Sequence, residues 1–404
     1  MIRDQKHLLV VPSGDFVRSY AGTAYLLDEL HEKGVRIRVA LRTTSNLAKE
    51  YDALPYECTL WVWGSPKWGR IRRLVASVAS RSWIVLKMMR TKYLLVTDSV
   101  FLAEAAFVKR IRGKGITVIQ FCHELQIDDC PTTCRRAGIY ARYARVPDFV
   151  IDVDPFRAEV RREHFRLVQK PYVLLNTLPR KALPKKEGRG RLSALAGGCD
   201  FCGRPVVVFT GGVGKEKPFE RVIDAIAQSG TNVFFVAFLT VDAGKISQLT
   251  QYAKERLSEG HYRICPAVTR TEILSAIWEA DIGVVDYTYS VEPTLNQKYC
   301  APTKLYEYMA SGLAVLGSNN DSLRRVIEGE GIGVCAQDDS VQSLAQGLKR
   351  LVANPALLCE MKLRAASCFA TKYSWEEVCS PVVEQILEEV GVPRSTHTMT
   401  NVNT

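Results

Sequence analysis

Residues 301–318 read Ala-Pro-Thr-Lys-Leu-Tyr-Glu-Tyr-Met-Ala-Ser-Gly-Leu-Ala-Val-Leu-Gly-Ser. This stretch predicts a polar turn, a short helix whose first turns carry Lys304 and Glu307, and a glycine stop at Gly312. The apolar residues 313–316 that follow are typical of a buried strand. By residue type alone, the stretch is an ordinary helix-to-strand unit of an α/β protein.

The start of this predicted helix is a candidate phosphate site. A helix start leaves backbone N–H groups unpaired and carries a partial positive charge, so it favours bound anions. Pro302 precedes the start, and Thr303 is a candidate N-cap residue. Glu307 stands about one turn further along, where its carboxylate can accept hydrogen bonds from a ribose diol.

Residues 302–312 follow the pattern Pro-x-Lys-Leu-x-Glu-Tyr-Met-Ala-x-Gly and precede a predicted apolar strand. This pattern resembles the donor-site signature of the GT-B glycosyltransferases. The resemblance is to the large retaining family 4 group in particular. It implies that Glu307 binds the ribose of a nucleotide sugar and is a candidate catalytic residue. It implies further that Thr303 and Lys304, with their backbone amides, bind the diphosphate, and that Leu305 belongs to the same donor site.

The chain departs from this pattern at one position. Many members carry a first glutamate eight positions before the second, and that position is Tyr299 here. A subset of the group instead reads Asn-x-x-x-x-x-Pro-x-Lys, which Asn296 to Lys304 fit. Asn296 and Tyr299 are therefore weaker candidates for the donor site.

Length and composition indicate a two-domain soluble protein. A chain of 404 residues fits two domains of roughly 180–200 residues each. Its residues are 47% hydrophobic and 24% charged, which is typical of globular proteins. There is no uninterrupted apolar run of about 18 residues, and the charged residues 1–7 do not resemble a signal peptide. We expect a cytoplasmic protein, with the inner face of the cytoplasmic membrane as a second possible place.

Twelve cysteines are scattered along the chain. The close pairs are Cys199 with Cys202 and Cys130 with Cys134, and together they would suffice for a four-thiolate zinc site. Nothing else in the sequence joins the two pairs, so free thiols are the default. We predict no metal and no resident cofactor.

Charge is unevenly distributed. Residues 1–200 hold 35 lysines and arginines against 20 acidic residues, a net charge of +15, whereas the remaining residues hold 19 against 23, a net charge of −4. A basic first half suits an anionic partner such as a membrane surface, a lipid phosphate or a nucleic acid. Nucleic acid is disfavoured, because the sequence contains no recognised binding module.

Residues 66–92 combine helical apolar spacing with arginines, lysines and tryptophans. The apolar set is Ile71, Leu74, Val75, Val78, Val85, Leu86 and Met89. Two interpretations are open, and both can hold at once. The segment is a crossover helix packed on a sheet, or it is a basic amphipathic helix that lies in a bilayer interface.

The first half alternates short apolar runs with helical patterns, which predicts parallel strands joined by crossover helices. The predicted strands are residues 7–12, 35–41, 59–63, 93–97, 116–122, 149–153 and 172–175. Ligands bind such sheets beyond the carboxyl ends of the strands. This places Gly14, Asp98 and His123 at one edge, with Gly14 as a donor-site candidate.

Residues 121–125, Phe-Cys-His-Glu-Leu, end one of these strands. A lone histidine is more often a satisfied structural group than a catalyst. The resemblance, however, implies a histidine at this strand end that faces the sugar ring near the acceptor. His123 is therefore the candidate catalytic residue of the first domain, and Glu124 either orients it or caps a helix.

The second half begins with a predicted strand at 205–210, followed by Gly211-Gly-Val-Gly-Lys-Glu-Lys217. A glycine-rich turn permits close backbone approach to a phosphate, so Gly212, Lys215 and Lys217 are candidate donor contacts. The family often has an arginine just after this strand, and that position is Gly211 here; Lys304 or Lys215 is the expected substitute. Ser318, in the loop after a later strand, is a weak candidate by the same resemblance.

We therefore predict an α/β protein of the GT-B class, with two Rossmann-like doubly wound domains facing across a cleft. The expected divisions are an acceptor domain at 1–180, a linker at 181–204, a donor domain at 205–372, a helix at 373–391 that packs back on the first domain, and a tail at 392–404.

The expected activity is transfer of a sugar, of hexosyl type, from a nucleoside-diphosphate sugar to a glycan, lipid-linked or small-molecule acceptor. Retention of the anomeric configuration follows from the resemblance, and a metal-dependent donor site of the GT-A kind is not expected. Peripheral contact with an anionic membrane is a further expectation, and nucleic acid is not expected as a partner. Two alternatives remain open: a non-hydrolysing nucleotide-sugar epimerase, and a binding protein that has the same GT-B fold but has lost catalytic activity.

Overall fold

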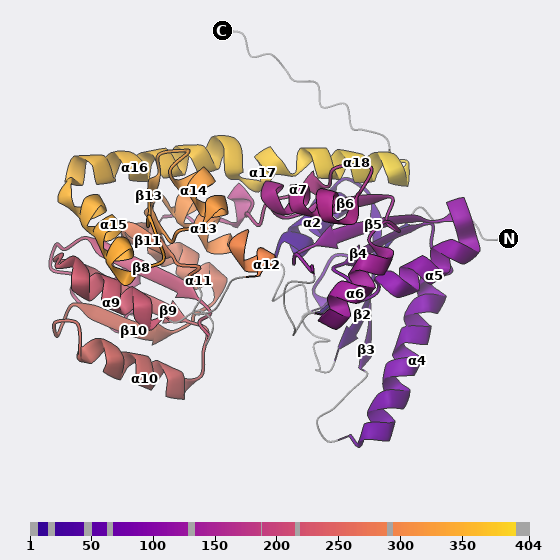
Figure 1. Ribbon diagram of the computed structural model, residues 1–404, viewed down its shortest axis with the longest axis horizontal. Helices are drawn as coiled ribbons and strands as arrows, with labels where there is room; N and C mark the ends of the chain where they lie inside the picture. The colour runs from indigo at the N-terminus through magenta and orange to yellow at the C-terminus, as the bar shows by residue number, and fades with distance from the viewer. Residues whose placement is uncertain are drawn as a thin grey trace, which may run out of the picture. The chain divides into compact units, whose positions relative to one another are not determined.

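The computed structural model describes residues 7–14, 21–43, 51–62, 68–127, 134–186, 188–214, 219–288 and 294–392 (Figure 1). The chain divides into two compact units. The first comprises Met1–Leu175 with Cys379–Thr404, and the second comprises Asn176–Val378. Each unit is built on a fully parallel sheet, which confirms the predicted α/β class.

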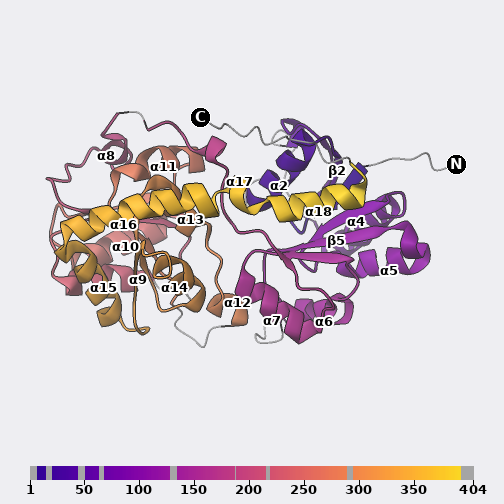
Figure 2. The same cartoon turned by 90° about the horizontal axis from the view of Figure 1, so that it is seen from above.

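The sheet of the first unit has seven strands in the order β3-β2-β1-β4-β5-β6-β7. They are β1 (His7–Val11), β2 (Arg36–Thr43), β3 (Glu57–Val62), β4 (Tyr93–Thr97), β5 (Thr117–Cys122), β6 (Phe149–Asp152) and β7 (Tyr172–Val173). Both faces are covered by helices (Figure 2), so β1 and β4 are buried along their whole length. The strand order reverses between β1 and β4, where an open α/β sheet usually binds ligands.

The helices of the first unit are α2 (Ala21–Glu32), α4 (Arg70–Met88), α5 (Leu102–Arg112), α6 (Cys134–Tyr143), α7 (Pro155–Phe165) and α18 (Ser380–Val390), with the 3-10 turn η1 (Gly113–Gly115). The helix α18 comes from the far end of the chain and packs against α2 and β7. The Tyr172 hydroxyl donates to Gln385 Oε1 at 2.7 Å, which ties α18 to the edge strand.

The sheet of the second unit has six strands in the order β10-β9-β8-β11-β12-β13. They are β8 (Val206–Gly211), β9 (Phe234–Leu239), β10 (Tyr262–Pro266), β11 (Ile282–Val285), β12 (Ala314–Gly317) and β13 (Gly333–Cys335). The order reverses between β8 and β11, so the carboxyl ends of these two strands mark the expected ligand position of this sheet.

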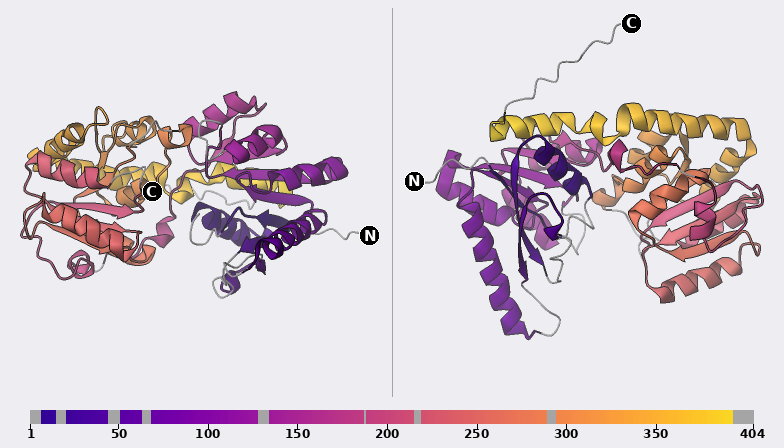
Figure 3. Two further views of the ribbon diagram at one scale, coloured as in Figure 1. Left: turned by 60° about the horizontal axis from the view of Figure 1, so that its bottom comes forward. Right: turned by 180° about the vertical axis from the view of Figure 1, so that it is seen from behind.

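The helices of the second unit surround this sheet (Figure 3). They are α8 (Arg191–Leu195), α9 (Glu220–Ser229), α10 (Ala243–Lys254), α11 (Arg270–Ala276), α12 (Leu295–Lys298), α13 (Thr303–Ser311), α14 (Asp321–Ile327), α15 (Val341–Ala353), α16 (Pro355–Cys368) and α17 (Trp375–Val378). Short turns complete it: η2 (Arg180–Ala182), η3 (Ile277–Glu279) and the π-type η4 (Phe369–Tyr373). Apolar faces of α9 and α15 pack on the sheet in one continuous core.

Two segments differ from the sequence expectations in detail. Residues 181–204, expected as a linker, belong to the second unit, where α8 packs against α11 and η3 and the Glu279 carboxylate accepts hydrogen bonds from the Gly190 and Arg191 amides. The helix expected at 373–391 is divided into α17 and α18. The break before α17 lies at Ser374, whose ψ of 158° is that of extended backbone.

Candidate functional site

The helix α13 is fixed to the sheet of the second unit by Tyr308. The Tyr308 hydroxyl accepts a hydrogen bond from the Thr210 amide at 2.9 Å and lies 3.1 Å from the Thr210 hydroxyl. Its ring occupies the space beside Gly283, where a Cβ would lie 2.3 Å from the ring. Burial raises the pKa of this phenol. The helix therefore begins at the point where the strand order reverses between β8 and β11.

The first turn of α13 differs from the prediction at Thr303. The N-cap residue is Pro302, whose side chain makes no capping bond, and Thr303 is already the first helical residue. The prediction of Thr303 as N-cap was wrong, because the extended conformation of an N-cap falls one residue earlier. Asn176 Nδ2 donates to the Ala301 carbonyl at 2.9 Å and holds the preceding turn. Leu305 is buried, and its amide donates to the Pro302 carbonyl at 3.3 Å.

Lys304 reaches the end of β8. Its ammonium lies 3.8 Å from the centre of the Phe209 ring and 5.9 Å from that of Tyr287. It also lies 3.7 Å from the place that a Cβ on Gly211 would occupy. A cation over an aromatic face is stabilised by the ring quadrupole. The positive charge is thus held at the carboxyl end of β8, beside the first turn of α13.

Glu307 is paired with Arg270, a residue that the sequence analysis missed. The two side chains meet with Arg270 Nε 2.8 Å from Glu307 Oε1, and the carboxylate side chain is only 12% exposed. Arg270 opens α11, which begins with a capping box between Thr269 and Glu272. The capping box predicts the helix start, but no local signal relates Arg270 to a carboxylate 37 positions later.

The other donor-site candidates that the structure describes in the second unit lie in loops and in the short helix α12. Ser318 is fully buried, and its hydroxyl accepts from the Tyr287 amide at 2.8 Å, so it braces the loop after β11. Gly212 is exposed just beyond β8. Asn296 lies in α12, and Tyr299 is the C-cap of that helix. Lys215 and Lys217 lie outside the described residues.

In the first unit, the carboxyl ends of β1, β4 and β5 are joined by hydrogen bonds. The Ser13 amide donates to Thr97 Oγ1 at 2.6 Å, and the Ser13 hydroxyl donates to Asp98 Oδ2 at 3.1 Å. Asp98 Oδ1 accepts from the His123 amide at 2.9 Å. Gly14 follows Ser13 in this turn, and no atom of the described residues lies within 4 Å of the place of its Cβ. The structure therefore brings together Gly14, Asp98 and His123 at one edge, as predicted for these strand ends.

Asp98 has a backbone φ of 50°, in the left-handed region that non-glycine residues rarely adopt. Its amide donates to the Phe121 carbonyl, and its own carbonyl accepts from Gln120 Nε2 at 2.8 Å. Burial raises the pKa of this carboxyl, against the opposing effect of the amides that it accepts from. These bonds hold the strained residue in place.

His123 lies buried among these groups. Its Nε2 is 2.8 Å from the Thr23 hydroxyl of α2, and Thr23 is fully buried. Burial lowers the pKa of His123 to about 4; Glu124 and Asp152 oppose this shift, and Arg157 adds to it. Arg157 Nη1 also donates to the His123 carbonyl at 2.7 Å. The imidazole is therefore neutral at physiological pH, and Thr23 is a partner that the sequence analysis did not identify.

Among the described residues, no group of three or more histidine, cysteine or acidic side chains is arranged to hold a metal ion. Cys199 is buried and Cys202 is exposed, both as free thiols, and Cys130 lies outside the described residues. Within the part of the chain that the structure describes, none of the helices combines the length and apolar character needed to span a bilayer.

Comparison with known families identifies the second unit. The sequence profile of the family described as glycosyl transferases group 1 matches residues 201–384. The matched residues contain α13, Glu307 and Arg270, and the match confirms the resemblance drawn from residues 302–312. A comparison with curated proteins finds no match to the chain.

Solved structures show the same fold over nearly the whole chain. Anabaena HepE in complex with UDP and glucose matches with a TM-score of 0.72 at 13% identity, covering 95% of this chain and 100% of that chain. Sucrose-phosphate synthase from Thermosynechococcus elongatus matches with a TM-score of 0.72 at 15% identity, covering 96% and 100%. A trehalose-6-phosphate structure from E. coli, bound with UDP-2-fluoro glucose, matches with a TM-score of 0.66 at 11% identity, covering 95% and 98%. These likenesses confirm the predicted GT-B fold class.

Proposed function

We propose that the chain is a glycosyltransferase that moves a sugar, of hexosyl type, from a nucleoside-diphosphate sugar to a glycan, lipid-linked or small-molecule acceptor, with retention and without a metal ion. The observation that carries the proposal is the position of Lys304. Its ammonium is held by the Phe209 ring at the carboxyl end of β8, beside the helix start that follows Pro302. A cation and a helix N-terminus at one point form a site suited to a diphosphate.

The donor would bind with its diphosphate against Lys304 and the first amides of α13. Catalysis of sugar transfer requires that charge building up on the departing diphosphate be stabilised, and preorganised donors do this efficiently. Glu307 would accept the ribose hydroxyls through the carboxylate oxygen that does not face Arg270. Arg270 would then be a positioning residue, since its Nε fixes the carboxylate through Oε1 at 2.8 Å.

The first unit would bind the acceptor. Its sequence is strongly basic, which suits an acceptor carried on a lipid phosphate at the inner face of the cytoplasmic membrane. His123 is proposed as the catalytic residue of this unit. Because its pKa is lowered to about 4, it would act as a neutral hydrogen-bonding imidazole with its orientation set by Thr23.

Calorimetry with UDP and UDP-glucose tests the donor site, and the UDP released with and without a polyprenyl-phosphate acceptor tests transfer. We expect Lys304→Met to weaken UDP binding at least tenfold, because a phosphate contact to a charged group contributes about 1.5–3 kcal/mol. Lys254→Met, which removes an exposed lysine from α10, should bind as the unchanged chain does. Equal UDP affinity of the two variants would contradict the proposed phosphate site. Failure of the chain to bind any nucleotide in a donor panel would contradict the function itself.

A further inference from the structure

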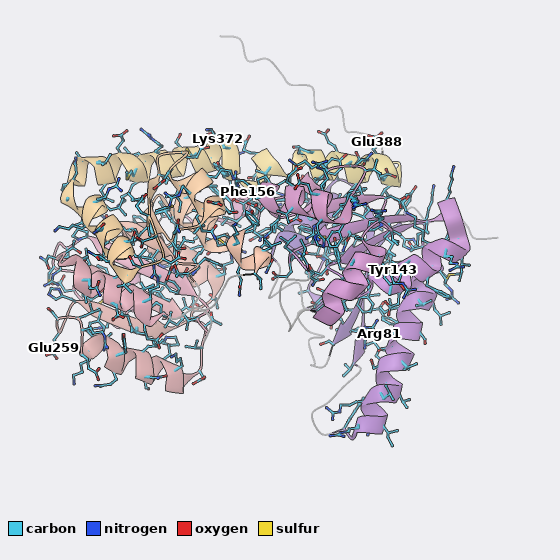
Figure 4. The ribbon with its side chains drawn as sticks, in the orientation of Figure 1. Arg81, Tyr143, Phe156, Glu259, Lys372 and Glu388 are labelled. Carbon is cyan, nitrogen blue, oxygen red and sulfur yellow. The ribbon has the colours of Figure 1, made fainter. Side chains whose placement is uncertain are left out.

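The helix α4 meets its own unit through two serines as well as through apolar residues. Ser77 and Ser80 lie on the side that meets the sheet, where Arg42 of β2 donates to Ser80 Oγ at 2.7 Å from Nε and to Ser77 Oγ at 3.2 Å from Nη2. Three of the 19 residues of α4 are buried, namely Ser80, Ile84 and Met88, and all lie in its second half. Figures 1 and 4 show α4 extending away from the sheet beyond Arg81.

The opposite face of α4 is apolar and exposed. Ile71, Leu74, Val75, Val78 and Leu86 have between 58% and 80% of their surface exposed. At about 100° per residue, these five side chains fall within about 60° on either side of Ile71. The serines that bind Arg42 fall about 120° or more from the same direction. In the first half of α4 the usual amphipathic arrangement is therefore inverted, since the apolar stripe faces away from the protein, whereas Ile84 and Met88 are buried in the second half.

Positive charge borders this stripe. Arg70 and Arg72 fall about 100° to either side of Ile71, and both are exposed, as is Arg73. The Arg72 guanidinium lies 4.3 Å from the centre of the Trp68 ring, just before the helix. No acidic residue occurs between Arg70 and Met88. An apolar stripe with arginines on both margins and a nearby tryptophan has the composition of a helix that lies in a bilayer interface.

We propose that α4 is a membrane-docking helix, whose exposed apolar stripe inserts into the interface of an anionic lipid bilayer while Arg70 and Arg72 contact lipid phosphates. Charge complementarity selects this occupant. A second copy of the chain would bring the same arginines against one another, and α4 offers no carboxylate to pair with them. An anionic bilayer supplies both an apolar layer and a negative surface. The surface is separate from the proposed donor site, so its test is independent of sugar transfer.

Flotation of the full chain with unilamellar vesicles tests the proposal. We expect binding to vesicles of equal parts phosphatidylglycerol and phosphatidylcholine, and at least tenfold weaker binding to phosphatidylcholine alone. The triple variant Ile71→Ser, Leu74→Ser, Val78→Ser keeps every charge and should bind anionic vesicles at least tenfold less. The matched control, Val168→Ser with Leu363→Ser, removes exposed apolar side chains outside α4 and should bind as the unchanged chain does.

A second readout locates the helix in the bilayer. Tryptophan fluorescence of Val78→Trp should be quenched by lipids brominated on their acyl chains, and that of Val168→Trp should not change beyond the background of the unchanged chain. All altered residues are exposed, so circular dichroism and thermal unfolding should match those of the unchanged chain.

Equal anionic-vesicle binding by the triple variant would overturn the proposal, because the general basic charge of the first unit would then explain binding. A dimer in lipid-free solution that the triple variant dissociates, without vesicle binding by either protein, would overturn it in favour of a second copy.

Discussion

The imidazole of His123 should stay neutral throughout the pH range in which the protein works. Burial in the first unit lowers its pKa from 6.5 to about 4, although Glu124 and Asp152 favour the charged form. In the unfolded chain the same group has its ordinary pKa. Below about pH 6.5, the unfolded chain therefore binds a proton that the folded unit does not.

This difference makes the first unit less stable in acid. The contribution of His123 to the free energy of unfolding is complete above about pH 6.5 and is lost as the pH falls toward about 4. The interval between 6.5 and about 4, at about 1.36 kcal/mol per pH unit, corresponds to a loss of about 3 kcal/mol. At about pH 5 the loss should be about 2 kcal/mol.

Nuclear magnetic resonance of histidine labelled at the Cε1 carbon measures the pKa directly. The chain has six histidines, and the signal missing from His123→Gln identifies the one of interest. Denaturant unfolding of both proteins at about pH 7.5 and about pH 5 then measures the linked stability. At the higher pH, His123→Gln should be less stable than the unchanged chain. Between the two pH values, however, its free energy of unfolding should fall by about 2 kcal/mol less than that of the unchanged chain.

Thr23→Val separates burial from hydrogen bonding. Because burial is the leading cause of the shift, the pKa of His123 should remain well below 6.5 without the Thr23 hydroxyl. A His123 signal that titrates with a midpoint between about 6 and 7 in the unchanged chain would refute the reasoning. Identical acid sensitivity of the unchanged chain and His123→Gln would refute it as well.

Three further predictions concern the second unit. Glu307→Ala should raise the dissociation constant of UDP about tenfold or more, by calorimetry, without unfolding the protein; an unchanged Michaelis constant and turnover would exclude its ribose role. Arg270→Leu should raise the Michaelis constant for the donor more than it lowers turnover, with partial rescue by Arg270→Lys, because Arg270 holds the Glu307 carboxylate from one side. Gly211→Ala should lower the free energy of unfolding by about 1–3 kcal/mol because φ is +116° there, whereas the control Gly212→Ala, whose Cβ would meet no atom of the described residues within 4 Å, should not.

The strands were largely predictable from the sequence. The predicted strand 93–97 has the bounds of β4, because it is an apolar run that ends at polar residues. The strand β13 (Gly333–Cys335) was not predicted, since three residues are too few to show a period. The close pairing of β13 with β12 requires glycine at position 333, because a Cβ there would lie 1.9 Å from the Val315 carbonyl oxygen. The local sequence pattern does not indicate this close contact.

The candidate site was predictable only where its signals are local. The helix start after Pro302 and the capping box at Thr269 follow from neighbouring residues. The pairing of Arg270 with Glu307, and that of Thr23 with His123, join elements far apart in the chain. Such contacts are set by sheet order and helix packing, which the sequence pattern does not specify residue by residue.

The orientation of α4 is a further feature that the sequence pattern does not specify. Its periodicity predicts an apolar stripe, but a period does not state which side of the helix faces the protein. That choice is made by Arg42, a residue of β2 whose guanidinium is satisfied by the Ser77 and Ser80 hydroxyls. Burial lowers the pKa of Arg42 to about 10, and it remains charged and in need of these acceptors. The inward face carries Ser77 and Ser80 beside this arginine, with Ile84 and Met88 buried further along the helix, and the apolar stripe is turned outward.

Gly211 stands where the resemblance leads us to expect an arginine, and the positive charge at this point comes from Lys304 instead. The φ of +116° at Gly211 is a conformation that arginine rarely adopts. A side chain at that position would also begin 3.7 Å from the Lys304 ammonium, in the space where the lysine crosses the Phe209 ring. An arginine carried by β8 would thus place a second positive charge beside the one that α13 carries. Because α13 supplies the lysine, β8 can end in glycine and still have a positive charge at its carboxyl end.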